Sequence, residues 1–410
     1  MSFLVSLRHL RAFIAVAEQG SVTRAAESLY RVQSAVTRSI RELERAFGVE
    51  LFERKATGML CTTFANAVLF RAKRAMHEFE LGADEIWGRS KSPGGAPKQR
   101  IPLALFNERR LIAFVKLVES GHMPTVAKAL GISQPAVSGA INDLEAGLGV
   151  ALFERTSKGM IATEVGQLLA FRVKRALAEL RHVETDIAAL LGTTQGRVVI
   201  GALPLGRTSI LPRAISDVLA RHPRLRFSTL ESPFDKLAAE LRAGDIDFIL
   251  GALRPPDYAH DLTGEPLLTD RMAVVVRAGH PLTRLPKITT VDLMQAQWVL
   301  SSHNTPARAL FDLSFTSRNL TPPVEAVETS DLAILRGLLL HSDMATAISA
   351  QQLHYEIAAG VLKVLDIELP NATRMIGITQ RAESHPSPGA LALMAAIRRI
   401  SAEIEEPHPA

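Results

Sequence analysis

The first half of this 410-residue chain repeats itself at a fixed offset of 101 residues. From Leu10 to Phe79, 28 of 70 positions are identical to the positions 101 residues further on. Whole motifs recur: Leu51-Phe52-Glu53-Arg54 returns as Leu152-Phe153-Glu154-Arg155. Unrelated segments do not agree at this level, so the chain contains one domain twice. The stretch from Ser90 to Pro102 contains a Pro-Gly-Gly-Ala-Pro sequence and is typical of a linker.

Composition narrows the class of protein. Apolar residues make up 47% of the chain, as in folded globular proteins. Cys61 is the one cysteine, which excludes an intramolecular disulfide and a cysteine-based zinc site. No apolar run approaches the roughly 18 residues that span a bilayer, and Arg8 and Arg11 interrupt the N-terminus too early for a signal peptide. We therefore expect a cytoplasmic, multi-domain protein with no membrane partner.

Positive charge gathers in the first quarter of the chain. The whole chain carries a net charge of +5, whereas residues 1–100 carry sixteen Lys and Arg against ten Asp and Glu. A basic N-terminal module suggests a polyanionic partner such as nucleic acid. A solvated basic face without a partner explains the excess equally well, so the choice depends on the local pattern.

Each copy has the pattern of a winged helix-turn-helix. In the first copy, apolar residues over 10–17 recur at helical spacing, and Gly20 ends that helix. Ser21 or Thr23 caps a short second helix, and a third helix follows a tight turn. The third helix turns an apolar stripe toward the core, made of Val36, Ile40 and Leu43.

The opposite face of this third helix carries side chains suited to DNA. They are short hydroxyl donors and arginines: Ser34, Thr37, Arg38, Arg41 and Arg45. Such groups bind phosphates and base edges in the major groove. The hairpin that follows carries Arg54 and Lys55 near its tip, where they can touch the DNA backbone or minor groove. A generic helix with this face would be merely solvated, but the tight turn and the hairpin favour DNA binding.

The second copy keeps the scaffold and loses the charge. Residues 133–147 contain no Lys or Arg and add Asp143. Phosphate contacts supply most non-specific affinity for DNA, so this copy is predicted to bind more weakly unless Arg155 and Lys158 in its hairpin compensate. A purely structural or dimer-forming role for the second copy is the alternative.

A long helix follows each hairpin. In the first copy, Ala65, Leu69, Ala72, Met76, Phe79, Ala83 and Ile86 follow a four-three spacing, and the second copy has a similar track broken by Glu184. This spacing is typical of a coiled-coil seam. The helix either packs on its own domain or pairs with another helix, from the other copy or from another chain.

This pattern resembles the DNA-binding domain of LysR-type transcriptional regulators. Copy one has the family-like Ser21-Val22-Thr23-Arg24-Ala25-Ala26, and copy two has Ser133-Gln134-Pro135-Ala136-Val137-Ser138. The family usually has one such domain per chain, and Gly139 stands where it has a basic residue. The helix faces and the resemblance together predict these DNA-binding residues: Thr23, Gln33, Ser34, Thr37, Arg38, Arg41, Arg54, Lys55, Ser133, Gln134, Pro135, Ser138, Asn142, Arg155 and Lys158.

The second half of the chain alternates strands and helices from Gln195 onward, which predicts an α/β fold. Strands are expected at 197–201, 226–231, 247–251, 272–276, 298–301, 362–365 and 375–379, with βα units over 324–340 and 345–353. Helices are expected at 209–221, 235–243, after Pro306, and at 388–403. Strands split around an inserted middle section indicate two lobes with chain crossovers.

This half also resembles the effector-binding domain of the same family, a two-lobed fold like that of periplasmic solute-binding proteins. In such folds the ligand lies between the lobes, at strand ends and helix N-termini. Each hydroxyl alone is more typical of a helix cap, but the convergence of these residues at βα junctions predicts an effector site, with Arg308 pairing with a carboxylate. The predicted effector residues are Thr208, Ser209, Ser232, Phe234, Ser301, Ser302, Asn304, Thr305, Arg308, Thr329 and Ser330.

The resulting fold class is α + α/β, in four stretches. They are a first winged helix-turn-helix with linker helix (1–90), a linker (91–101), a second copy (102–192) and an effector domain (195–410). Lobe I is expected at about 195–268 and 367–405, and lobe II at about 269–366. No Gly-rich phosphate loop, nucleophile elbow or His-Glu-x-x-His motif is present, so we expect no catalytic residue, cofactor or metal.

The sequence therefore predicts a LysR-type regulator of transcription that responds to a ligand. Its expected partners are promoter DNA, a small organic acid or sugar as effector, other copies of itself, and RNA polymerase. The effector would bias lobe closure and reorient the DNA-binding domains. The alternative is an intracellular solute-binding sensor whose duplicated domains serve mainly oligomerisation.

Overall fold

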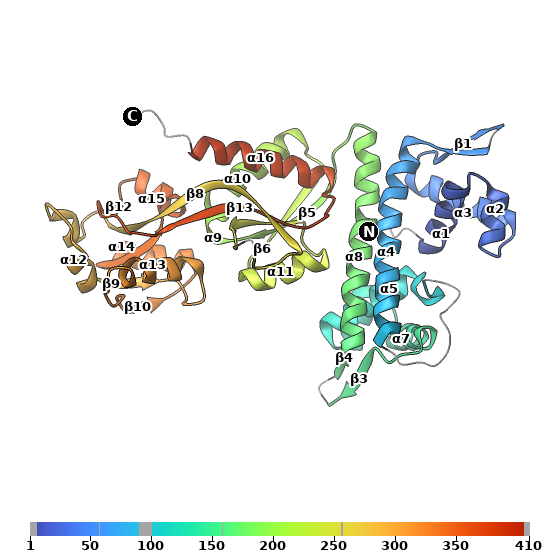
Figure 1. Ribbon diagram of the computed structural model, residues 1–410, viewed down its shortest axis with the longest axis horizontal. Helices are drawn as coiled ribbons and strands as arrows, with labels where there is room; N and C mark the ends of the chain where they lie inside the picture. The colour runs from blue at the N-terminus through green and yellow to red at the C-terminus, as the bar shows by residue number, and fades with distance from the viewer. Residues whose placement is uncertain (1–5, 57, 90–100, 158, 256, 406–410) are drawn as a thin grey trace. The chain divides into compact units, whose positions relative to one another are not determined.

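The computed structural model describes residues 6–56, 58–89, 101–157, 159–255 and 257–405 (Figure 1). The chain divides into two compact units, residues 1–196 with 242–245 and residues 197–241 with 246–410. Almost all of the expected linker, and Lys158, lie outside the described residues.

Copy one of the repeat consists of three helices, a two-stranded wing and a long helix. Its elements are α1 (Leu7–Gln19), α2 (Val22–Ser28), α3 (Gln33–Phe47), β1 (Phe52–Lys55), β2 (Gly58–Cys61) and α4 (Thr63–Arg89). Gly20 and Gly48 end α1 and α3 in the left-handed conformation, with φ of 63° and 69°, which glycine adopts without steric penalty. Ser21 caps α2 by accepting a hydrogen bond from the backbone N–H of Arg24.

Copy two repeats this structure at the same offset. It contains η1 (Leu103–Leu105), α5 (Glu108–Ser120), α6 (Met123–Leu130), α7 (Gln134–Leu148), β3 (Phe153–Thr156), β4 (Gly159–Ala162) and α8 (Glu164–Leu190). Apart from the added η1 and a one-residue extension of α6, every element spans the residues 101 positions after its counterpart. One hydrophobic core, running from Leu7 to Ile187, contains buried residues of both copies.

The second unit is built on a mixed sheet with helices on both faces. Its first part contains β5 (Gly196–Ala202), α9 (Pro204–Thr208), α10 (Ile210–Arg221), β6 (Leu225–Leu230), α11 (Phe234–Ala243), β7 (Phe248–Ala252), β8 (Leu262–Arg277) and η2 (Pro281–Arg284). Its middle part contains α12 (Thr290–Gln295), β9 (Gln297–Leu300), α13 (Pro306–Thr316), β10 (Glu325–Glu328), α14 (Leu332–His341) and β11 (Met344–Ser349). The remaining elements are η3 (Ala350–Leu353), α15 (His354–Ala358), β12 (Leu362–Val364), β13 (Thr373–Arg381) and α16 (Pro388–Glu405).

The strand order is β10-β9-β11-β8-β13-β7-β5-β6, with β12 also paired to β8. β9 pairs in parallel with β10 and β11, and β5 pairs in parallel with β7. β8 joins the two ends of this order, because its first half pairs with β13 and its second half pairs with β11 and β12.

Alternation along the strands creates a separate core on each face. In β5, Val198 and Ile200 point into a core shared with α10 and α16, whereas Val199 packs against a core that includes α11. β9 repeats this at the other end of the sheet, where Trp298 faces α13 and Val299 faces α14. A strand with both faces buried is expected to carry a continuous apolar run, as these two do.

The expected strand at 272–276 is much longer in the structure, since β8 spans Leu262–Arg277. The part before Met272 carries acidic residues, so the apolar run that predicts a strand begins only at Met272. Asp270 is buried beside Arg374 of β13 at 2.9 Å, and Glu265 binds Arg398 of α16 at 2.6 Å. The short helices α9, α12 and α15 were not predicted, because each is too brief to show an apolar periodicity.

Candidate functional site

The predicted DNA-reading face of copy one, the side of α3 opposite its apolar stripe, points away from the protein core. Val36, Ile40 and Leu43 of α3 are buried, with at most 5% of each residue exposed. The other side of the helix exposes Gln33, Ser34, Arg38 and Arg41, with Thr37 half-buried, and Thr23 is exposed on α2. The apolar stripe thus fixes which side chains of α3 point away from the domain.

The wing brings a second set of predicted residues to the same surface. A groove of about 520 Å³ between α3 and the wing is lined by Thr37 and Arg41 of the helix and by Arg54 and Lys55 of β1. Both wing residues are exposed. Helix and wing therefore bring Arg41, Arg54 and Lys55 to one groove, whose lining also includes Glu44, Glu50 and Glu53. Lys55 pairs with Glu53 at 3.3 Å. Arginine and lysine side chains are the groups that bind a phosphate backbone.

The reading face of copy two is neutral. Gln134, Pro135 and Asn142 are exposed and Ser138 is half-buried, while Ser133 caps α7 by accepting a hydrogen bond from the Ala136 N–H. Asp143 at the edge of this face binds Arg110 of α5 at 2.7 Å. Arg155 is exposed on the wing. The side chains that remain are amides and hydroxyls, which suit base edges more than phosphates.

Tyr30, in the turn between α2 and α3, was not predicted as a functional residue. It is 92% exposed and has a φ of 53°, in the left-handed region where a bulky residue is rare. Copy two has Gly131 at this position, with a φ of 65°. Comparing the two copies could have revealed it, because an aromatic residue replaces the glycine of the turn.

A network of ion pairs between α4 and α8 was also missed. We call its eight members the seam charges: Arg71, Arg74, Glu78 and Glu85 on α4, and Arg172, Arg175, Glu179 and Asp186 on α8. Their conserved offset was visible in the sequence, since Lys73-Arg74-Ala75 recurs as Lys174-Arg175-Ala176.

The centre of this network is buried. The side chains of Arg71 and Glu179 are 4% and 5% exposed and lie 2.9 Å apart. Burial alone would raise the pKa of Glu179, but hydrogen bonds from Arg71 and Arg74 and their charges hold that pKa below its ordinary value. Both groups are therefore charged at neutral pH.

The predicted effector residues fall into two groups in the second unit. The first follows β5 and β6. Thr208 ends α9 and donates to the Leu205 carbonyl at 3.2 Å, and Ser209 and Ser232 are half-buried beyond it. Phe234 is 3% exposed, with Tyr258 and the Arg254 guanidinium against its ring, so its side chain belongs to the core. Phe234 also lines a small pocket with Arg254 and Tyr258, so its contact with an effector stays a prediction.

The second group follows β9 and β10, whose parallel pairing brings their carboxyl ends together. Ser301 lies 3.0 Å from the Thr305 hydroxyl, which caps α13, and the Thr329 N–H donates to the Leu300 carbonyl. Ser302 is half-buried, and Asn304 and Ser330 are exposed beside them. The structure thus gathers all the predicted residues of these two loops at one sheet edge.

Arg308 has carboxylate partners within the chain itself. Its side chain is 4% exposed and binds Asp312 at 2.9 Å and Glu325 at 2.7 Å. Hydrogen bonding from Arg308 is the main cause that lowers the pKa of Glu325. The predicted pairing of Arg308 with an effector carboxylate therefore competes with two internal ion pairs.

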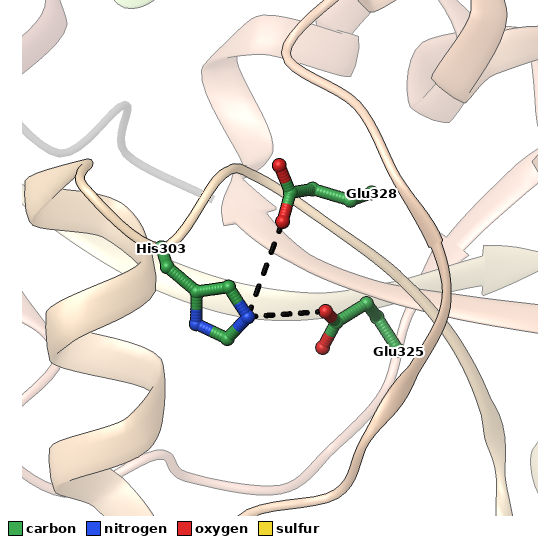
Figure 2. A group of neighbouring side chains, drawn as sticks. All are labelled: His303, Glu325 and Glu328. Atoms are coloured by element: carbon green, nitrogen blue, oxygen red, sulfur yellow. Dashed lines mark hydrogen bonds and ion pairs between the residues drawn. The ribbon is translucent and has the colours of Figure 1, made fainter.

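Glu325 also belongs to a small polar cluster with His303 and Glu328 (Figure 2). The Nε2 atom of His303 lies 3.2 Å from a Glu325 oxygen and 3.9 Å from a Glu328 oxygen. These are metal-ligand types, and their atoms lie within 4.8 Å of one another. The guanidinium of Arg308 on the other Glu325 oxygen disfavours a cation here, so we assign the cluster to the packing of the Ser301–Thr305 loop.

Comparison with known proteins identifies both halves. The model of the LysR substrate binding domain matches residues 191–401, and that of the bacterial regulatory helix-turn-helix protein, lysR family, matches twice, at 7–66 and 109–167. The HTH-type transcriptional regulator GalR of Pseudomonas putida is 50% identical over 98% of both chains. The regulator PcaQ of Agrobacterium fabrum is 29% identical over 72% of this chain and 95% of its own.

Solved structures agree with this fold. A full-length OxyR variant from Pseudomonas aeruginosa is similar with a TM-score of 0.54 and 24% identity, over 70% of this chain and 93% of that one. The LysR family regulator CbnR is similar with a TM-score of 0.52 and 20% identity, over 72% and 98%. The predicted fold class, with helix-turn-helix domains before an α/β effector domain, is confirmed.

The relatives named are transcriptional regulators, and none of the helices in the described part of the chain is long and apolar enough to cross a membrane. Two family models together match most of the sequence, in the order expected for one protein. The chain belongs to the LysR family of DNA-binding, ligand-responsive transcriptional regulators.

Proposed function

We propose that this regulator binds a promoter operator through α3, α7 and their wings. The groove that Arg41 shares with Arg54 and Lys55 carries this proposal, because three cations from two elements meet there, beside the carboxylates of Glu44, Glu50 and Glu53. The proposed contacts are Thr23, Gln33, Ser34, Thr37, Arg38, Arg41, Arg54 and Lys55 in copy one, and Ser133, Gln134, Pro135, Ser138, Asn142, Arg155 and Lys158 in copy two. CbnR has been solved in complex with its target DNA.

A mobility-shift assay on DNA beside the gene, with a salt titration, tests the proposal. Arg38→Ala with Arg41→Ala should lower affinity and flatten the salt dependence, because about two phosphate contacts are lost. Gln134→Ala with Ser138→Ala should weaken binding to the specific site more than to unrelated DNA. If wild type binds every sequence equally and only at low salt, the proposal is wrong.

The effector we propose is a small organic acid or sugar bound at the ends of β5, β6, β9 and β10, between lobes at about 195–268 with 367–405 and about 269–366. Hydroxyls dominate these ends, from Ser209 and Ser232 in one lobe and Ser301 and Thr329 in the other. Hydroxyl and backbone donors bind either ligand class. RNA polymerase and further copies of the chain complete the proposed partners of a cytoplasmic regulator.

Thermal-shift measurements with a panel of organic acids and a panel of sugars separate the two classes. Asn304→Ala with Ser330→Ala should abolish the ligand-induced shift, because both residues are exposed beside the proposed site. Gln295→Ala, exposed at the end of α12 in the same part of the unit, is the control and should leave the shift unchanged. A shift that survives the double substitution would place the ligand elsewhere.

A further inference from the structure

The long helices of the two copies pair with each other inside one chain. α4 and α8 lie side by side (Figure 1). They run antiparallel, because Arg71 in the first half of α4 meets Asp186 near the end of α8, while Glu85 near the end of α4 meets Arg172 in the first half of α8. Phe79 in the middle of α4 is fully buried. The apolar seam predicted for α4 therefore packs against the long helix of the other copy.

This pairing is self-complementary. Arg71 binds Glu179 at 2.9 Å, and its counterpart 101 positions later, Arg172, binds Glu78 at 3.1 Å. The other contacts among the seam charges are duplicated in the same way. The contacts between arginine and aromatic ring recur as well. Arg71 lies against Phe70, and Arg172 lies against Phe171. Reciprocal contacts of this kind are the mark of a two-fold symmetric dimer.

Burial makes the pairing obligatory for each helix. Arg71 and Glu179 are almost fully buried, and a buried charge that loses its partner is strongly destabilising. The seam charges of α4 are satisfied by those of α8 and are therefore not offered to a second chain. One chain thus already holds the paired arrangement that two identical domains would otherwise make between chains.

We call the helix-turn-helix of each copy, together with its wing, a head. The two heads differ in the side chains that their third helices expose. Both helices expose a glutamine, Gln33 in α3 and Gln134 in α7. α3 then presents Arg38 and Arg41, whereas α7 has Gly139 and Asn142 at these positions and no basic residue. Arginines anchor on phosphates and guanines, and amides pair with adenine edges. We infer that one chain is a complete two-headed reader of double-stranded DNA, whose operator consists of two unlike half-sites. This inference rests on the proposed function, in which both helices read DNA.

The test asks whether the seam works within a chain or between chains. The probe is the DNA that full-length wild type selects from double-stranded oligonucleotides randomised over about four helical turns, or roughly 40 base pairs. One variant reverses the charge of the two α4 residues that bind Glu179 (Arg71→Glu, Arg74→Glu). A second variant reverses the charge of their α8 partners (Glu179→Arg, Asp186→Arg). Each variant alone should lose roughly a hundredfold in affinity, because like charges then face each other.

Two combinations of these substitutions then distinguish a seam within one chain from a seam between two chains. All four substitutions in one chain should restore binding, whereas an equimolar mixture of the two half-reversed chains should not. If the mixture restores binding, the seam forms between chains and the inference falls while the proposed function stands. If wild type selects no sequence at all, the proposed function itself fails. Arg398→Glu, which reverses an ion pair of the other unit, is the control and should bind like wild type.

A second experiment does not depend on refolding the seam. One chain has its first head disabled (Arg38→Ala, Arg41→Ala) and another its second (Gln134→Ala, Asn142→Ala), all at exposed positions. Mixing them should give no recovery if both heads of one chain must act together. Operators with either half-site duplicated in place of the other should also bind wild type at least about tenfold more weakly. Recovery on mixing, or preference for a palindrome, would overturn the inference.

Discussion

Glu179 of α8 accepts hydrogen bonds from both Arg71 and Arg74 of α4, at 2.9 and 3.0 Å, in a site from which water is nearly excluded. Two cations on one buried carboxylate balance its desolvation and tie the two copies together. The copies therefore depend on the ionisation of this side chain.

The stability of the paired helices is expected to fall in acid. The pKa of Glu179 is held below its ordinary value of about 4.3, so its contribution is complete above that pH and is lost as the pH drops through the folded-state pKa. Urea unfolding followed by circular dichroism between about pH 7 and pH 3 measures this. Glu179→Gln should be less stable than wild type at neutral pH and show a shallower acid loss; an unchanged pH profile would contradict the assignment.

The wing of copy one is expected to depend on Gly58. This residue has a φ of 128°, and a Cβ there would lie 2.5 Å from the Gly20 carbonyl oxygen. Gly58→Ala should destabilise the domain by roughly 2 kcal/mol or more, because backbone must move. Gly48→Ala is the matched control: its φ is 69° but nothing lies within 4 Å, so only about 1 kcal/mol of left-handed strain is expected. Equal losses in thermal unfolding would argue against the close approach.

Tyr30 is expected to lower the free energy of unfolding and to raise the affinity for DNA. Tyr30→Gly relieves the left-handed strain that Gly131 avoids in copy two, so the free energy of unfolding should rise by up to about 1 kcal/mol. The same substitution removes a 92% exposed ring beside the reading face, so operator affinity should fall. Tyr30→Phe keeps the ring and should retain most of the affinity. Unchanged binding by the glycine variant would leave the exposed ring without a role in DNA contact.

Removing the Arg308 guanidinium is expected to destabilise the second unit. Arg308→Met keeps an apolar stem but removes the buried cationic partner of Glu325, leaving only the exposed His303 beside that carboxylate, at a cost of about 3 kcal/mol. Arg271→Met is the control, because the ion pair of Arg271 with Glu368 is 65% and 70% exposed and such pairs contribute less than about 1 kcal/mol. Differential scanning calorimetry should show the larger drop for Arg308→Met, and similar drops would mean that the buried pair is not structural.

Sequence reasoning succeeded where a local pattern determines the structure. The stripe of Val36, Ile40 and Leu43 defined the free face of α3, and Gly20 marked the end of α1, because helical period and left-handed glycine are local properties. Because the repeat has a fixed offset, the same two predictions, the free face of the third helix and the glycine that ends the first helix, apply to copy two.

What the sequence could not supply depended on distant partners. The part of β8 before Met272 carries Glu265 and Asp270, whose cations lie more than 100 residues away, so nothing nearby marked it as a strand. The partner of α4 was left open for the same reason. The internal pairing of Arg308 was missed although Asp312 is only four residues away, because a basic residue at the start of a helix after β9 was assigned to a ligand. Charges in a sequence show that partners are needed, but only the fold shows which residues they are.

Covalent union of the two copies changes how binding specificity can evolve. In a dimer of identical chains, one substitution alters both reading helices at once, and the operator must change symmetrically to follow. Here α3 and α7 are encoded separately yet held as a pair by α4 and α8, so a mutation in one leaves the other intact. In the proposed mode of binding, each half-site of the operator can therefore diverge on its own, because one recognition helix follows the change while the other keeps its contacts with the DNA.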